Sequence, residues 1–234
     1  MNKLTRLIVI VVFLAIPLYA NAGIIKDVEL YLQATGPSGY VYIEEKTENV
    51  YFDYDAGLNG GALSEAFCVE NANAVNGSTS RYTLLTVDSS LSGFGLTVDK
   101  YLKAAAIAQY YWNNYEGRGT AYQEDIYKAA AQIAIWEIMF ESDVNSSFDL
   151  TSGSFRTGLY KTQALDIWNA VKSSIPTSSS EWALAVSPTI TGGTIQQEDF
   201  QNYLVRYHVP EPASLMLFGL GLLGLAGIGR KRKK

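Results

Sequence analysis

"KAAAQIAIWEIM", residues Lys128 to Met139, reads as the middle of a buried helix. Small and apolar residues occupy nearly every side, and their spacing predicts a helix from about Tyr122 to Phe140. On such a helix Gln132 shares one face with four apolar residues, Ala129, Ile135, Trp136 and Met139. Burying an unpartnered amide costs about 1–3 kcal/mol, so Gln132 must meet hydrogen-bond partners in another part of the fold.

Strand-like runs lie on both sides of the helical region. Alternating runs rich in Tyr, Val, Thr and Phe predict strands at 28–34, 40–46, 49–53, 62–70 and 81–88, with the turn "TGPSG" (35–39) between the first two. Two more helices are expected, from about Val98 after an N-cap at Thr97 and from about Gly158 to Ser173, followed by strands at 182–186 and 203–209. The sequence therefore predicts an α+β fold: a sheet-rich, β-sandwich-like part with a helical insert.

The first 22 residues have the three parts of a secretory signal peptide. Lys3 and Arg6 precede an apolar run at 7–18, and the small residues Ala20 and Ala22 form an A-x-A cleavage site. We expect residues 1–22 to be removed and the mature chain to begin at Gly23.

The last 25 residues form a second targeting segment. Pro210, Glu211 and Pro212 precede an apolar run at 213–229 and a basic tail at 230–234. The run is near the lower limit of about 17 residues for crossing a bilayer, and the basic tail would remain on the cytoplasmic side. The segment 210–234 resembles the PEP-CTERM sorting signal of Gram-negative bacteria. This resemblance implies a transmembrane helix held transiently in the inner membrane, cleavage by an exosortase at Pro-Glu-Pro, and release to the cell surface or an extracellular matrix.

Trimming both ends leaves one domain, 23–209, which is strongly acidic. Seven of the 18 basic residues and one of the 23 acidic residues lie in the two end segments, so 11 basic and 22 acidic residues remain. Nucleic acid and anionic membrane surfaces require a basic footprint, and the sequence predicts neither as a partner of the domain.

The composition also limits the catalytic chemistry. The chain has one histidine, His208, and one cysteine, Cys68. No metal-ligand spacing, G-x-S-x-G, H-E-x-x-H or P-loop motif is visible in the sequence, and we expect no metal or other cofactor. The carboxylate pairs Glu44-Glu45, Glu124-Asp125 and Asp53 with Asp55 are interpreted as solvated side chains of an acidic domain rather than a glycosidase pair.

Cys68 offers a second kind of partner for Gln132, beside backbone groups of a neighbouring strand. A single cysteine in an exported chain cannot form an intramolecular disulfide, so it is either buried and inert or chemically used. If its thiolate attacks the Gln132 carbonyl and expels ammonia, an internal thioester results. The donors to the developing oxyanion cannot be named from the sequence.

The residues around both positions carry a resemblance. "FCVE" (Phe67, Cys68, Val69, Glu70) and "AQIAIW" (131–136) resemble the two signature motifs of bacterial thioester domains, which occur at the tips of Gram-positive surface adhesins. The resemblance implies a Cys68–Gln132 cross-link, with Ala131, Ile135 and Trp136 as context of the second motif. That family often has Thr before the Gln, where this chain has Ala131. Phe67, Val69, Ile135 and Trp136 are the expected shield against water.

The resulting hypothesis is an exported adhesion protein that attaches covalently to an amine or hydroxyl of an extracellular protein or polysaccharide. The event is single-use, so the protein would not be an enzyme. The alternative is a non-covalent structural or carbohydrate-binding matrix protein in which Cys68 is buried and reduced. A cysteine hydrolase or transglutaminase using Cys68 with His208 ranks last, because His208 lies two residues before Pro210.

Overall fold

The computed structural model describes residues 23–44, 46–70, 79–141, 148–187, 190–191, 194–195 and 201–207. The expected signal peptide, the sorting segment and His208 lie outside these residues. Within the described part of the chain, no helix combines the length and apolar character needed to cross a membrane.

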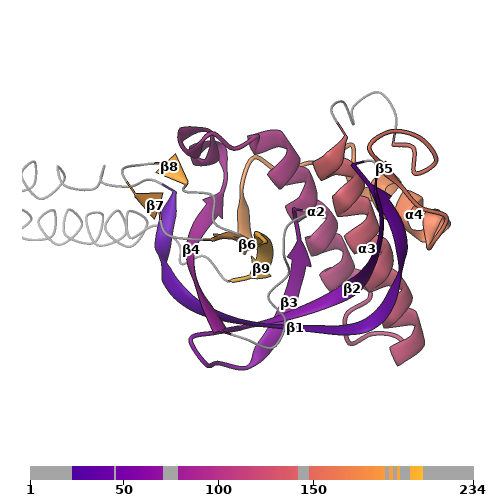
Figure 1. Ribbon diagram of the computed structural model, residues 1–234, viewed down its shortest axis with the longest axis horizontal. Helices are drawn as coiled ribbons and strands as arrows, with labels where there is room; N and C mark the ends of the chain where they lie inside the picture. Colours follow the sequence, from indigo (N-terminus) through magenta and orange to yellow (C-terminus); the bar gives the residue numbers. More distant parts are fainter. Residues whose placement is uncertain are drawn as a thin grey trace, which may run out of the picture.

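All strand pairings of the described domain are antiparallel, and the strands curve around one core (Figure 1). The main sheet has the order β2-β3-β9-β6-β4-β1-β5, and its members are β1 Ile24–Ile43, β2 Lys46–Leu58, β3 Leu63–Cys68, β4 Thr79–Val87, β5 Phe155–Arg156, β6 Ser179–Val186 and β9 Tyr203–Arg206. Two short strands, β7 Ile190–Thr191 and β8 Thr194–Ile195, form a separate pair.

The main sheet closes on itself, which differs from the predicted sandwich. The long strand β1 pairs with β4 over Ile24–Tyr31 and with β2 over Leu30–Ile43. The β1–β2 pairing joins the two ends of the order β2-β3-β9-β6-β4-β1 into a ring of six strands. The sheet-rich α+β class is confirmed, but a single curved sheet encloses its own core instead of two sheets facing each other.

The segment "TGPSG" lies within a strand and is not a turn. β1 runs through it, and the pairing with β2 shifts register between Thr35 and Ser38. Gly36 has a φ of +69° in this irregularity, and a Cβ there would lie 2.9 Å from the Asp53 side chain. The prediction of two strands was wrong because glycine and proline mark a β-bulge as readily as a turn. The chain reverses after Ile43 instead, where Glu44 has a φ of 45°.

Three α-helices gather beside the closed sheet (Figure 1). They are α2 Val98–Asn114, α3 Ala121–Phe140 and α4 Lys161–Val171, and a 3₁₀ turn η1 Ser89–Phe94 precedes them. The expected helix at 122–140 is confirmed as α3, which begins with a capping box between Thr120 and Gln123. Trp136 of α3 packs against Phe52 of β2 and Phe155 of β5, at ring-centroid distances of 6.0 Å each.

Glu137 is a buried carboxylate on the same helix. Its Oε1 accepts a hydrogen bond of 2.8 Å from the Asp149 amide, whereas Oε2 has no partner among the described residues. Burial raises the pKa of Glu137 from 4.5 to about 7, despite the amide of Asp149, which lowers it. The folded state therefore holds this proton at pH values where the unfolded chain has released it.

We predict that Glu137→Gln removes a pH dependence of stability. Since the folded pKa lies above the unfolded one, stability is fully present below pH 4.5 and falls as the pH rises to about 7. The parent should lose about 1–3 kcal/mol across this window, and the variant should not. Urea unfolding at pH 4.5 and pH 8 measures the difference. A parent and variant with parallel pH profiles would contradict the assignment.

Candidate functional site

Cys68 lies at the end of β3, where one neighbouring strand stops pairing. β3 pairs with β2 as far as Tyr54 opposite Ala66, while its pairing with β9 continues to Cys68 opposite Tyr203. One edge of the Cys68 main chain thus needs partners from elsewhere. Cys68 is completely buried, so the protein itself must supply them.

Gln132 supplies both partners. The Cys68 amide donates to Gln132 Oε1 at 2.9 Å, and Gln132 Nε2 donates to the Cys68 carbonyl at 2.8 Å. Gln132 is fully buried, and its amide takes the place that a neighbouring strand would otherwise fill. The structure therefore brings Cys68 and Gln132 together. The hydrogen-bond partners expected for the buried Gln132 amide are the main-chain groups of Cys68.

The Cys68 thiol is neutral in this environment. Burial raises its pKa to about 12, although the Glu70 carbonyl and the Trp136 side chain lower it. Sγ donates to the Glu70 carbonyl at 2.8 Å. A thiol with this pKa can act as a nucleophile only if its proton is removed during the attack.

Two polar groups next to the thiol are suited to handle that proton and charge. The indole N–H of Trp136 lowers the thiol pKa as a hydrogen-bond donor to the sulfur, and it has no other hydrogen-bond partner within the described part of the chain. The Glu70 carboxylate raises the thiol pKa by its charge, and its own pKa is raised by burial. Asn202 holds the carboxylate through a 2.5 Å hydrogen bond from Nδ2 to Oε1.

The start of β9 fixes the loop that follows Cys68, which the sequence did not indicate. The Val69 amide donates to the Asn202 carbonyl at 3.1 Å, and Gln201 Nε2 donates to the Glu70 carbonyl at 2.8 Å. Both Gln201 and Asn202 are buried polar residues. Nothing in their sequence context links them to position 68, because the pairing of β3 with β9 spans most of the domain.

The expected shield residues lie on two sides of β3. Val69, Ile135 and Trp136 are buried, as is Ala131 before the glutamine. Phe67 is also buried, but successive residues of a strand point to opposite faces. Its ring packs on Tyr111 and Trp182, at centroid distances of 5.9 and 5.5 Å. Phe67 therefore covers the opposite face of β3 from the thiol, which differs from the expectation.

A pocket of about 430 Å³ opens at the two residues that follow Cys68. Val69 and Glu70 line one part of it, and Met139, which lies one helical turn beyond Trp136, lines another. Lys100 contributes a cation and donates to the carbonyls of Met139 and Glu141, at 2.8 and 2.6 Å. Val69 and Glu70 directly follow Cys68 in the chain, whereas neither Cys68 nor Gln132 lines the pocket itself.

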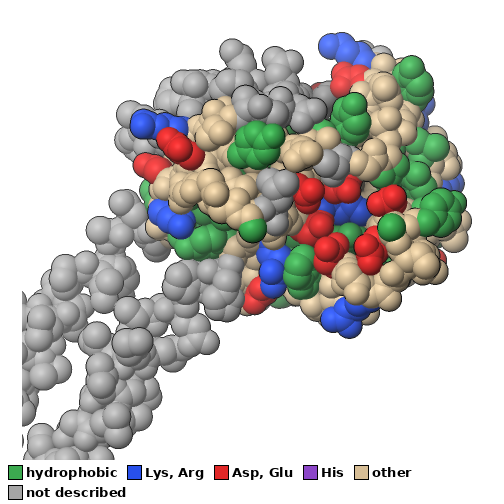
Figure 2. All heavy atoms as spheres, turned by 90° about the horizontal axis from the view of Figure 1, so that it is seen from below, with side chains coloured by type: hydrophobic (Ala, Val, Ile, Leu, Met, Phe, Trp, Pro, Cys, Tyr) green, Lys and Arg blue, Asp and Glu red, His purple; other side chains and the backbone are tan. Residues whose placement is uncertain are grey.

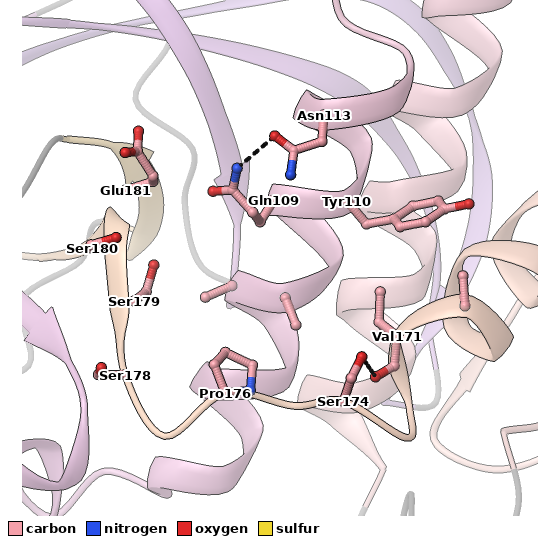
Figure 3. Close-up of a pocket in the computed structure, with 13 residues that line it drawn as sticks. Gln109, Tyr110, Asn113, Val171, Ser174, Pro176, Ser178, Ser179, Ser180 and Glu181 are labelled. Carbon is pink, nitrogen blue, oxygen red and sulfur yellow. Dashed lines mark hydrogen bonds between the residues drawn. The ribbon is translucent and has the colours of Figure 1, made fainter.

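A second hollow, of about 490 Å³, lies between α2, the end of α4 and β6 (Figure 3). Its lining is rich in hydroxyl and amide groups: Gln109, Tyr110, Asn113, Ser174, Ser178, Ser179 and Ser180. Gln109 donates to Asn113 at 2.9 Å and accepts from Trp182 Nε1 at 3.0 Å. This hollow contains none of the residues around Cys68.

The carboxylates singled out in the sequence differ in their environments. Glu44 and Asp125 are exposed, in keeping with the expectation of solvated side chains. Asp53 and Asp55 are partly buried and, with Glu65, form a cluster in which one carboxylate oxygen of each residue lies within 4.8 Å of the others. The buried ammonium of Lys128 contacts this cluster, at 3.4 Å from Asp53. The reading of Asp53 and Asp55 as solvated was wrong, since α3 provides them with a buried cation.

Residues 208–233 match the PEP-CTERM protein-sorting motif. The chain carries a PEP-CTERM sorting signal. The signal confirms the resemblance drawn from the C-terminal residues, marks an exported protein with a cell-envelope or surface destination, and implies processing by an exosortase. No curated protein and no solved structure is significantly similar to the chain.

We predict that Gln132→Ala destabilises the fold more than Cys68→Ala does. The first change leaves two buried main-chain groups of Cys68 without partners, which should cost about 2–4 kcal/mol. The second keeps both groups paired and removes only Sγ, which should cost about 1 kcal/mol. Urea unfolding followed by tryptophan fluorescence compares the two variants. An equal loss in both would show that the amide does not stabilise the strand edge.

Proposed function

We propose that this exported protein attaches covalently to an extracellular partner through an internal thioester between Cys68 and Gln132. The observation that carries the proposal is the orientation of the amide. Its Oε1 already accepts the Cys68 N–H at 2.9 Å, so a donor is aimed at the atom on which negative charge would develop. The same alignment satisfies the edge of β3, and it also places the Gln132 carboxamide against the residue that carries the nucleophile.

The proposed reaction needs no co-reactant. Sγ of Cys68 attacks Cδ of Gln132, the S–Cδ bond forms, the Cδ–Nε2 bond breaks, and ammonia leaves with the proton of the thiol. Glu70 is the group proposed to carry that proton, because it lies two residues after Cys68, its own carbonyl accepts the thiol hydrogen bond, and burial raises the pKa of its carboxyl. Trp136 would hold the sulfur as it becomes negative, since its N–H has no other partner in the described chain.

The product would be an acyl group protected by burial. Cys68 and Gln132 are both fully buried, so water reaches the thioester carbonyl poorly and hydrolysis is slow. A partner that docks in the pocket of Val69, Glu70 and Met139 would have to displace part of this lining before its amine or hydroxyl attacks the buried carbonyl and releases the thiol. The partner becomes linked to Gln132 through an amide or ester, once per protein molecule.

The test is the intact mass of the full chain purified in detergent. The parent should lie below its encoded mass by one ammonia, whereas Cys68→Ala and Gln132→Ala should not show this loss. Methylamine should add to the parent and free one titratable thiol. Gln163→Ala, which changes a glutamine of α4, is the matched control and should keep the loss of ammonia. Trp136→Phe should form the bond about tenfold more slowly or worse.

A full-length mass with no loss of ammonia, together with a thiol that titrates only after unfolding, would contradict the covalent function. The second candidate would then be glycan binding in the hollow lined by Gln109, Asn113 and the serines of Figure 3, because neutral hydroxyl and amide groups match the hydroxyls of a polysaccharide. Binding to the producer's matrix polysaccharide should then be weakened by Asn113→Ala and unchanged by Cys68→Ala.

A further inference from the structure

Lys128 is a lysine in the interior of the protein. It lies on α3 one helical turn before Gln132 and is only 1% exposed. Lysine side chains are seldom fully buried, because removing an ammonium from water is costly unless charges and hydrogen bonds compensate. The surroundings of Lys128 therefore need an explanation that the Cys68–Gln132 pair does not provide.

Carboxylates and aromatic rings surround the amine. Nζ is in direct contact with Glu65 Oε2 and lies 3.4 Å from Asp53 Oδ1. The rings of Phe67 and Tyr111 cover it, at 4.6 and 5.4 Å from their centroids. On the face seen in Figure 2, acidic side chains gather around basic ones.

The strand register produces this arrangement. Glu65 of β3 lies directly opposite Asp55 of β2, and Asp53 is two residues before Asp55, on the same face of its strand. Phe67 is two residues after Glu65 and so shares this face. The Lys128 amine thus contacts Asp53 of β2 and Glu65 of β3 beneath the aromatic rings. The side chain of Glu65 is only 12% exposed.

The geometry points to an intramolecular isopeptide bond between Lys128 Nζ and Glu65 Cδ. The amine attacks the carboxyl carbon, the N–C bond forms, a C–O bond of the carboxyl breaks, and one water leaves. The ammonium and carboxylate of the ion pair together contain all the atoms of the amide and that water, so no oxidant, reductant or co-reactant is needed.

The enclosure favours condensation over a simple ion pair. The amine and the carboxyl are already in contact, so the reaction is intramolecular and does not need the entropy cost of bringing two molecules together. Rings and strands restrict the return of water. Asp53 is placed to take a proton from the amine and to give one to the departing oxygen. Burial also lowers the pKa of Lys128 to about 8, although Asp53 and Asp55 raise it, so part of the amine is neutral near pH 7.

The three carboxylates alone would also suit a metal ion. The amine contacts two of them, however, and occupies the position that a cation would need. Condensation removes one positive and one negative buried charge, which eliminates much of the cost of burying the pair.

The bond would join β3, which carries Cys68, to α3, which carries Gln132. It lies one helical turn from Gln132 on α3 and three residues from Cys68 on β3. It would hold the two elements together whether or not the thioester forms, so it does not rest on the proposed function.

High-resolution mass and tryptic mapping of the full chain in detergent test the bond. The Cys68→Ala variant serves as the background, since it cannot form a thioester and lose ammonia, and it keeps Gln132 paired with the main chain of residue 68. Its mass should be lower than encoded by one water. Trypsin should fail to cut after Lys128, and residues 47–81 should remain joined to residues 119–156 in a methylamine-resistant peptide.

Variants distinguish the bond from a structural ion pair. Lys128→Arg and Glu65→Ala should each abolish the loss of water, and Asp53→Asn should slow it on the order of 100-fold while leaving both reacting groups present. Lys103→Arg is the matched control, because Lys103 forms an ion pair with Asp99, whose side chain is 61% exposed, and it should leave the loss unchanged. An encoded mass with complete cleavage after Lys128 would overturn the proposal and leave an ion cluster only.

Discussion

The fold depends on how the free edge of β3 is satisfied at Cys68. β2 stops pairing at Ala66, and without another partner the buried N–H and C=O of Cys68 would each cost about 1–3 kcal/mol. Gln132 satisfies both with one side chain, which fixes the height and rotation of α3 against the closed sheet. The apolar contacts of Trp136 then follow from that placement, since hydrophobic packing alone allows a helix to slide or turn, whereas two directed hydrogen bonds do not.

The buried polar contacts between α3 and β3 form one continuous row, called the seam below. Lys128 and Gln132 lie one turn apart on α3, and they meet Glu65 and Cys68 on β3. Lys128, Gln132 and Cys68 are buried, the Glu65 side chain is 12% exposed, and each is matched to a complementary group, so the contacts of the seam are specific in a way that those of the surrounding alanines are not. Those alanines at 129–131 and 134 have a different role, since their small size lets the strand approach the helix closely enough for the amide to reach the main chain.

The sequence predicted those features that depend on residues close together in the chain. The 3.6-residue period gave α3 within one residue of its observed start, and the three-part C-terminal pattern predicted the sorting signal. The closure of the sheet could not be predicted, because it depends on β1 pairing with two strands along its length and on a bulge at residues 35–38 that looks like a turn. The roles of Lys128, Gln201 and Asn202 depend on contacts between distant strands, and a single sequence contains no signal for such contacts.

The two hydrogen bonds of Gln132 have different fates in the proposed chemistry. The Cys68 N–H can stay on Oε1 from amide to thioester, whereas Nε2 departs and leaves the Cys68 carbonyl without its donor. Leaving that buried carbonyl without a partner costs about 1–3 kcal/mol, which is less than the several kcal/mol by which holding the reacting groups together lowers the barrier. A lone buried cysteine is therefore compatible with either function. The feature that favours chemistry is that the bond to be kept, and not the bond to be broken, is the one donated by the main chain of the nucleophile.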